Sequence, residues 1–469
     1  MRGGYLAILA GILLAGCKVG PDYHRPVIDT PQAFVHEPDE VTATADAAWW
    51  MLFGDPVLDQ LIAEGLANNK DIKIAAANVE QARGVLISTR SPLFPQINYQ
   101  GDASRNRVSR LGPSALPAGV HNPIDTYQVL AGASWEIDLW GRIRRMTESA
   151  QANLLATQEA RRGIILSLLA SVATDYLVLR GLDEQLAIAQ RTEARYGESL
   201  RSMELKYQYG RVSQMNVDQA RARFETAATQ VPQIQANIGV LENAMSILLG
   251  RNPGQIPRGK SIYELTLPTI PGGLPSQLLE RRPDLLQSEQ QLVAANALIG
   301  AARAEYFPTI SLTGATGYSS LELSNLFKGA ARTWNYGGGI TGPIFTGGLV
   351  YGQVKQAEAA EKAAELSYEA AIQSAFADVD NALISQRELV NQVDAQERLV
   401  TALKSYTRLS QYLYEGGREP YSTVLQAEED LFPAELNWAM ERANLYVGIV
   451  SIYKAMGGGW IDAAAGRRD

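Results

Sequence analysis

The chain has 469 residues, 46% of them hydrophobic, and a formal net charge of −8 at pH 7. This acidic balance, without any dense block of Lys and Arg, argues against nucleic acid as a partner. Cys17 is the single cysteine, which excludes an intrachain disulfide and a zinc site built on cysteines. His24, His36 and His121 show no paired spacing of metal ligands.

Residues 1–16 have the pattern of a secretory signal peptide, with Arg2 ahead of an apolar run and small residues after it. Leu14-Ala15-Gly16-Cys17 resembles a bacterial lipobox, in which the cysteine is acylated and becomes the mature N-terminus. The alternative is an ordinary signal peptide that happens to contain a cysteine. Lys18 follows where an aspartate would favour the inner membrane, so the resemblance points to the outer membrane. Residues 17–48 are Pro-rich and predict an extended tether.

No apolar run of about 20 residues is expected after Cys17, so a membrane span there is predicted to be β-structure. Residues 126–138 alternate between apolar and polar side chains, and only Leu130 interrupts the polar set. This pattern is typical of a two-faced strand. Residues 94–104 match it more weakly, and a polar loop with several prolines joins the two segments. The sequence therefore predicts a β-hairpin over residues 94–138.

Residues 142–207 contain no proline and predict one long helix. At about 1.5 Å per residue this helix would be roughly 100 Å long, far longer than the core helix of a small domain. Gly210-Arg211-Val212-Ser213 predicts a turn, with Ser213 placed to cap a return helix. Together these segments predict a long helical hairpin over residues 142–249.

The second half of the chain repeats the first. Phe94-Pro95 matches Phe307-Pro308 at an offset of 213 residues, and Gly210 matches Gly417 at an offset of 207. The repeat predicts a second β-hairpin over residues 310–345 and a second helical hairpin over residues 349–456. We expect a first structural repeat with its connector over 49–275, a second repeat over 276–456 and a C-terminal tail over 457–469.

Four strands of about 10–13 residues could each cross an outer membrane when tilted. Four strands cannot close into a barrel, and open edges in lipid leave backbone groups unsatisfied, so several copies must close the sheet together. Two copies would give a barrel filled by its own side chains, whereas three would leave room for water. The predicted fold class is mainly α with a membrane β-barrel. It is a trimeric, internally duplicated assembly in which a twelve-stranded barrel, four strands per chain, continues into a long α-helical barrel.

Six segments carry a resemblance to a known family: Cys17-Lys18-Val19-Gly20-Pro21-Asp22-Tyr23, Trp135-Glu136-Ile137-Asp138-Leu139-Trp140-Gly141, Tyr207-Gln208-Tyr209-Gly210-Arg211-Val212-Ser213-Gln214, Leu248-Leu249-Gly250-Arg251-Asn252-Pro253-Gly254, Leu279-Glu280-Arg281-Arg282-Pro283-Asp284 and Pro343-Ile344-Phe345-Thr346-Gly347-Gly348. They resemble the TolC-like outer-membrane factors, specifically the NodT-type efflux lipoproteins, and the resemblance covers nearly the whole chain. It implies a homotrimer in the outer membrane whose tunnel meets a periplasmic adaptor protein and an inner-membrane pump, expected to be of the RND type.

The resemblance also implies site residues at the two helical turns. An adaptor hairpin would dock at the tips, on Gly210, Arg211, Val212 and Ser213 of the first turn and on Gly417 and Tyr421 of the second. The alternative is that glycine and serine only turn and cap the helices. Glu419 stands where related channels commonly have an aspartate that constricts the closed tunnel, so Glu419 and Arg418 are the expected gate. For Glu419 the alternative is a carboxylate stabilised at a helix N-terminus, and Arg418 could simply be solvated.

The remaining motifs predict structure. Arg281-Arg282-Pro283-Asp284 is predicted to serve a helix start, and Glu428-Glu429-Asp430 to lie on a solvated or lumen-facing helix surface. No nucleophile–base arrangement, metal-ligand spacing or cofactor loop stands out. We therefore expect no enzyme activity, no cofactor and no metal.

The sequence thus predicts a passive exit duct for small molecules of the multidrug type in a tripartite efflux system. We expect it to be lipid-anchored in the outer membrane and to extend into the periplasm. One alternative is the outer-membrane channel of a type I protein or peptide secretion system. Another is a structural or enzymatic lipoprotein with solid helices.

Overall fold

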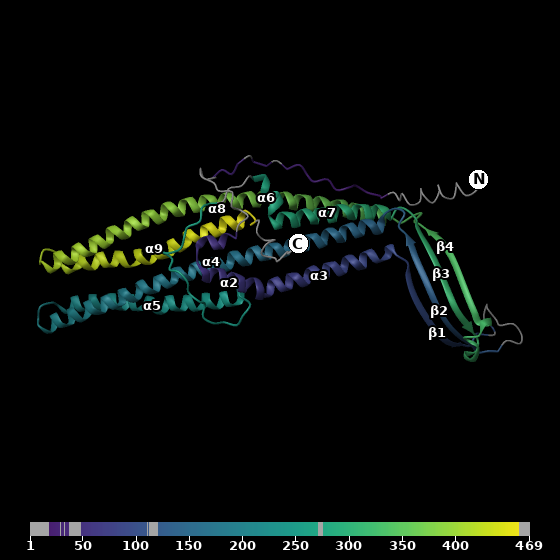
Figure 1. Cartoon of the computed structure of the whole chain (residues 1–469), viewed down its shortest axis with the longest axis horizontal. Helices are drawn as coiled ribbons and strands as arrows, with labels where there is room; N and C mark the ends of the chain where they lie inside the picture. Colours follow the sequence, from purple (N-terminus) through teal and green to yellow (C-terminus); the bar gives the residue numbers. More distant parts are fainter. Residues whose placement is uncertain are drawn as a thin grey trace. The chain divides into compact units, whose positions relative to one another are not determined.

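The structure, a computed structural model, describes residues 18–28, 30–31, 33–36, 48–109, 111, 121–270 and 275–458. Its described part is mainly helical and contains one four-stranded sheet (Figure 1). The chain divides into two compact units. Unit 1 combines Met1–Val27, Val79–Thr157 and Ser288–Tyr368, and unit 2 combines Ile28–Asn78, Gln158–Gln287 and Glu369–Asp469. Each unit therefore draws segments from both halves of the chain.

Unit 1 contains the sheet, whose strands are β1 (Gln96–Asn106), β2 (Ile124–Ile137), β3 (Thr309–Ser320) and β4 (Arg332–Thr341). They pair antiparallel in chain order, so β1 and β4 form its edges. The fourth strand is shorter than the sequence predicts, because it ends at Thr341 rather than near Phe345. Pro343 follows, and a proline cannot donate a hydrogen bond to the ladder.

Four helices dominate the rest of the molecule: α4 (Arg142–Gln208), α5 (Gln214–Leu248), α8 (Leu349–Glu415) and α9 (Tyr421–Ala455). α4 and α8 each have 67 residues, and α5 and α9 each have 35. The equal lengths reflect the duplication that the sequence predicts. The predicted end of the first long helix, at residue 207, lies one residue before the observed end.

Glycines end all four long helices at duplicated positions. Gly210, Gly250, Gly417 and Gly457 have φ angles of 66°, 72°, 67° and 81°, a left-handed conformation that costs glycine little. Each backbone N–H bonds a carbonyl three residues earlier. After Gly210, Gly250 and Gly417 the next N–H reaches back five residues, which completes a Schellman turn.

The shorter helices are α2 (Pro56–Asn68), α3 (Lys70–Arg90), α6 (Pro275–Arg281) and α7 (Pro283–Ala304). The sequence predicts one helix over about residues 276–306, but α6 and α7 are separate. The break falls at Arg282 because the following proline disfavours helical geometry there. Arg282 is buried, and its guanidinium donates to Asp284 and Asp378 and to the carbonyl of Ala455. These contacts agree with the predicted structural role of this segment.

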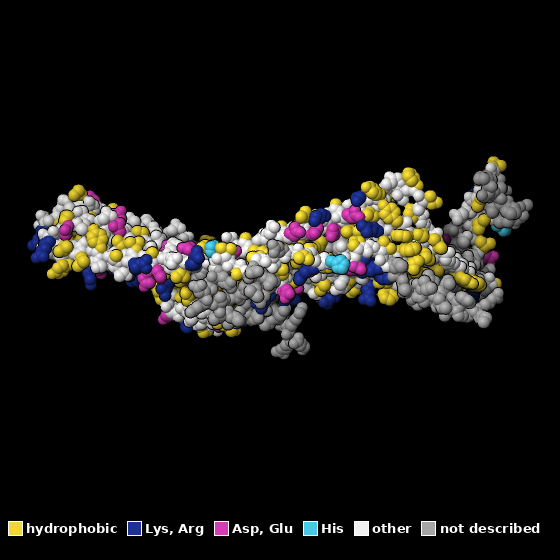
Figure 2. All heavy atoms as spheres, turned by 90° about the horizontal axis from the view of Figure 1, so that it is seen from above, with side chains coloured by type: hydrophobic (Ala, Val, Ile, Leu, Met, Phe, Trp, Pro, Cys, Tyr) yellow, Lys and Arg dark blue, Asp and Glu magenta, His cyan; other side chains and the backbone are white. Residues whose placement is uncertain are grey.

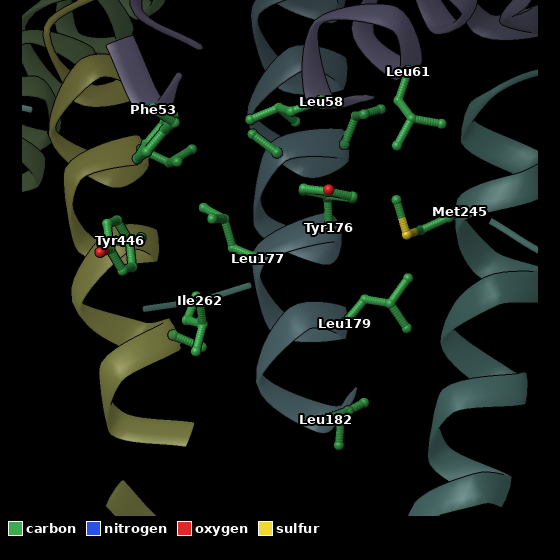
Figure 3. Packing of buried hydrophobic residues seen from close by; sticks show 14 of the residues in the cluster. Phe53, Leu58, Leu61, Tyr176, Leu177, Leu179, Leu182, Met245, Ile262 and Tyr446 are labelled. Atoms are coloured by element: carbon green, nitrogen blue, oxygen red, sulfur yellow. The ribbon is translucent and has the colours of Figure 1, made fainter. Parts of the chain in front are cut away.

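The main core of unit 2 surrounds the middle of α4. Figure 3 shows Leu177 and Leu179 of α4 between Met245 of α5 and Tyr446 of α9, all of them buried. α4 contains an 18-residue stretch of mean hydropathy 1.6, long and apolar enough to cross a membrane by length and composition, and 56% of it is buried. The sequence-based expectation of no apolar run of about 20 residues after Cys17 overlooked this stretch of α4.

Asp55 connects two distant segments to this core. Its carboxylate is fully buried and accepts hydrogen bonds from the Tyr176 hydroxyl at 2.7 Å, from Val57 N at 2.9 Å and from Lys260 N at 3.1 Å. The Tyr176 hydroxyl in turn accepts from Gly259 N at 2.9 Å. Burial, and then the bonded Asp55 carboxylate, raise the pKa of Tyr176, so the hydroxyl stays a donor at physiological pH.

Candidate functional site

The first helical turn joins α4 to α5 in unit 2. Arg211 and Ser213 are exposed, and Val212 is half-buried against a small cluster that includes Met203 and Val217. The prediction that the Ser213 side chain caps α5 is wrong. It makes no capping bond and instead donates to Asn216 Oδ1 at 2.6 Å, although its backbone is extended as in a cap.

The second turn joins α8 to α9. Gly417, Arg418 and Glu419 are exposed, and Glu419 accepts a hydrogen bond from Thr423 Oγ1 at 3.2 Å. Tyr421 differs, because it is only 7% exposed and its hydroxyl lies 3.1 Å from Ser199 Oγ of α4. Figure 2 shows Lys and Arg side chains (dark blue) at the left end of the molecule, where Figure 1 draws the two turns. The turns therefore expose backbone, charged side chains and, directly before Gly210, the ring of Tyr209, which is 78% exposed.

A partly buried ionic group lies behind the turns, between the two helical hairpins. Arg223 of α5 is 3.6 Å from Glu428 and 3.5 Å from Glu429, both of α9. The Tyr196 hydroxyl of α4 donates to the backbone carbonyl of Glu428 at 3.0 Å. These residues line a cavity of about 700 Å³ together with Phe432.

The prediction of a solvated surface at Glu428 is wrong, because its side chain is only 12% exposed, whereas that of Glu429 is 71% exposed. Burial raises the pKa of the Glu428 carboxyl, and Arg195 and Arg223 oppose this shift. Burial likewise raises the pKa of Tyr196 to about 12. Helical spacing gives only a partial signal for Glu428. It lies three residues before Leu431 and four before Phe432, which are both buried, but the exposed Glu429 also lies three residues before Phe432.

Glu428→Gln should raise the melting temperature at pH 7. A carboxyl whose pKa is higher in the folded state favours folding below its ordinary pKa of 4.5 and disfavours it as the pH rises. The neutral amide removes that cost, and Arg223 keeps Glu429 as its partner. The gain should shrink as the pH falls towards 4.5, whereas the exposed Glu429→Gln control should change little. A lower melting temperature for Glu428→Gln at pH 7 would contradict this reading.

The segment just after Cys17 is held against the rest of unit 1, although Cys17 itself lies outside the described residues. Lys18 pairs with Glu148 at 2.6 Å, and Val19 N donates to the carbonyl of Trp140 at 3.1 Å. The buried Arg145 donates to the carbonyls of Val19 and Gly20, both at 3.1 Å, and to further side-chain partners, Asp22 at 3.0 Å and Glu148 at 3.1 Å.

The junction between β2 and α4 fixes the helix end of the sheet, meaning the end at Gln96, Ile137, Thr309 and Thr341. Asp138 accepts from the backbone N–H groups of Ile143 at 3.0 Å and Arg144 at 2.9 Å, which caps the start of α4. The Trp140 indole donates to the carbonyl of Pro308 at 2.8 Å and stacks on Phe307. One of the six family-like segments thus meets the repeated Phe-Pro pair.

The strand register separates the side chains of the sheet into two faces. The apolar face includes Ile97, Tyr99, Val129, Trp135, Leu312, Trp334, Tyr336 and Ile340. The polar face includes Asn98, Gln100, Asp102, Gln128, Ser134, Thr313, Ser319 and Asn335, and Leu130 interrupts it. Tyr99 is 91% exposed and Tyr336 82% exposed, so the described residues leave much of the apolar face uncovered. In the described part of the chain, no group of three or more His, Cys, Asp or Glu side chains is placed to hold a metal ion.

Comparison with known proteins places the chain in a family. The family model for the outer membrane efflux protein matches residues 61–251 and 274–458. These two segments begin 213 residues apart and end 207 residues apart, which are the two offsets of the predicted repeat.

Individual relatives match along almost their whole length. The solvent efflux pump outer membrane protein SrpC of Pseudomonas putida is 36% identical over 97% of this chain and 98% of its own. The cation efflux system protein CusC of Escherichia coli is 34% identical over 97% and 98%. The solved structure of the Campylobacter jejuni CmeC outer membrane channel has a TM-score of 0.88 and 27% identity, over 94% of this chain and 95% of its own. The chain belongs to the outer membrane efflux protein family, whose members are outer-membrane channel components of efflux systems.

Proposed function

We propose that three copies of the chain close into one duct that crosses the outer membrane and serves as the exit of a tripartite efflux pump. The observation that carries this proposal is the four-stranded sheet, which has one apolar and one polar face and, among the described residues, two unpaired edges. Lipid cannot satisfy the backbone groups of an open edge, so β4 of one copy must pair with β1 of the next. Twelve strands would place the polar face around water and the apolar face against lipid.

The mass of the detergent-extracted assembly tests this closure. We expect a trimer that conducts ions in planar bilayers. A stable lone protomer, or a density map with a filled centre, would overturn the proposal.

The partners we propose are a periplasmic adaptor at the helical turns and an inner-membrane pump of the RND type. Exposed backbone at Gly210 and Gly417, flanked by Arg211 and Arg418, offers polar groups for such contacts. Tyr421 is only 7% exposed, so little of its side chain is accessible to an adaptor. We propose no catalytic role and no cofactor, and a lipid anchor at Cys17.

The exported compounds we propose are small organic molecules of the multidrug type. Named relatives serve solvent and cation efflux, which supports efflux over protein secretion. A deletion strain should become sensitive to solvents and antibiotics while its secreted proteins stay unchanged. Sensitivity to metal salts alone would shift the substrate to metal cations, and loss of a secreted protein would favour the secretion alternative.

Glu419→Gln should lower the cation preference of the duct, because three exposed carboxylates around the axis would attract cations and repel anions. The permeability ratio of potassium to chloride in planar bilayers should fall towards one. Glu415→Gln is a suitable control, since Glu415 is also exposed and lies four residues away on α8. Equal ratios in wild type and Glu419→Gln would remove Glu419 from the gate.

A further inference from the structure

Two arginines lie on the apolar face of the sheet at its loop end, which is the end opposite the helix end. Arg105 is level with Asp125 across β1 and β2, and Arg332 begins β4 opposite Tyr318. The register places both arginines on the face that carries Tyr99 and Trp334. A charged side chain on a lipid-facing surface is costly near the bilayer midplane and tolerated at the interface. The two arginines therefore mark the rim of the apolar band.

The stagger of the strands places Arg105 and Arg332 at the same depth. At the helix end, the row of paired residues that starts at Gln96 of β1 crosses the sheet and reaches β4 at Gly337. Gly337 lies four residues before β4 ends at Thr341. At the loop end, the last row of paired residues that reaches β3 joins Ala103, Tyr127 and Ser320. Ser320 lies two residues beyond Tyr318, the partner of Arg332, and Arg105 lies two residues further along β1. The same shift at both ends is what tilted strands of a barrel require.

The attachment of the N-terminal segment identifies the leaflet. Val19 is bonded to Trp140 at the helix end of the sheet, and Lys18 directly follows the predicted acylated cysteine. Acyl chains at that point would enter the inner leaflet of the outer membrane. The loop end, with Arg105 and Arg332, then faces the outer leaflet.

Closure of the proposed trimer would bring the two arginines together. When β4 of one copy pairs with β1 of the next, neighbouring strands lie about 4.8 Å apart, and Arg332 stands beside Arg105 of the adjoining copy. Arg105 Nε is 3.4 Å from Asp125 Oδ1, and its side chain remains 70% exposed. Arg332 is exposed and has no ion-pair partner among the described residues. Arg105, Asp125 and Arg332 together therefore carry one net positive charge at each junction.

We propose that each of the three junctions binds a phosphate group of the outer-leaflet lipopolysaccharide through Arg105 and Arg332. Guanidinium groups match phosphate oxygens in a bidentate geometry. Beside Arg332, Trp334 and Tyr336 stack with ring centroids 5.7 Å apart, as in the aromatic girdle that barrels place at the membrane interface. This inference rests on the proposed closure into a ring.

The test is the lipid that the purified trimer retains. Trimers of wild type, Arg105→Gln, Arg332→Gln and the double variant are washed in neutral detergent and incubated with lipopolysaccharide or with phosphatidylglycerol. Bound lipid is then counted by native mass spectrometry. We expect each single variant to bind lipopolysaccharide about fivefold more weakly, as expected for one interfacial arginine. Lysine at both positions should restore part of the binding.

Arg387→Gln is the matched control, because Arg387 is an exposed arginine of α8 paired with Glu388. Equal lipopolysaccharide binding by the double variant and this control would overturn the proposal. So would equal losses of lipopolysaccharide and phosphatidylglycerol, since these would indicate general attraction to anionic lipid. A wild-type protein that is not trimeric would instead refute the proposed closure of the barrel. The mass of the protein assembly in the same spectra distinguishes that outcome from a loss of lipid binding. If the Gln variants do not form trimers, the double variant with lysine at positions 105 and 332 replaces them. A salt titration of the wild type is then added, in which lipopolysaccharide binding must weaken as the salt concentration rises.

Discussion

Asp55→Ala is expected to destabilise unit 2 by about 3–5 kcal/mol, among the larger effects of a single substitution. The substitution removes a fully buried carboxylate and leaves the Tyr176 hydroxyl and the N–H groups of Val57 and Lys260 without their acceptor. A buried donor left unsatisfied costs about 1–3 kcal/mol. Thermal unfolding followed by circular dichroism should show the loss, together with faster protease cleavage near Lys260.

The control for this prediction is Asp394→Ala, which removes an exposed carboxylate from α8. A graded test is Tyr176→Phe, which removes one hydroxyl and should cost about 1–2 kcal/mol. If Asp55→Ala unfolded at the same temperature as Asp394→Ala, the carboxylate would not be what holds residues 259 and 260 on α4.

Arg145→Ala is expected to release the segment that follows Cys17, with a loss of about 3 kcal/mol. The Arg145 side chain is 1% exposed, and its guanidinium is shared among two backbone carbonyls and two carboxylates. Without it, the carbonyls of Val19 and Gly20 lose their donor. Hydrogen exchange in residues 18–25 should accelerate, and the melting temperature should fall.

Arg83→Ala provides the comparison, since Arg83 is an exposed arginine that pairs with Glu80 three residues away. Such surface pairs contribute about 0.3–0.5 kcal/mol. Arg145→Lys should recover little, because one ammonium cannot reach all four acceptors. Unchanged exchange in residues 18–25 of Arg145→Ala would show that other contacts hold the segment.

The sequence predicted the elements well because their signals are local. Period-two alternation located β2, and the absence of proline located α4 to within one residue. The duplication supplied the second half by copying the first. The misjudged points involve local competition between backbone and side chain. Pro283 divides one predicted helix in two, and the Ser213 hydroxyl bonds Asn216 instead of the helix end.

The residues that hold the fold together were not predictable in the same way. Asp55 and Tyr176 are 121 positions apart, and Arg145 and Val19 are 126 apart. No periodic pattern indicates such pairs, because each is defined only when distant segments meet. Glu428 was misplaced for a related reason. Its neighbours Glu429 and Asp430 are charged, and only the packing of α9 against α4 and α5 shows which of the three is buried.

The repeated glycine turns have a consequence for symmetry. Gly210 and Gly417 give both turns the same backbone path, yet Val212 in the first corresponds to Glu419 in the second. A ring of three chains would present six loops of one shape in which a half-buried valine alternates with an exposed carboxylate. Gene duplication would thus have made the scaffold pseudo-sixfold, while later divergence left its surface chemistry threefold. A docking protein that contacts only the main chain would find six equivalent loops. One that contacts charged side chains would distinguish the three loops with Glu419 from the three with Val212.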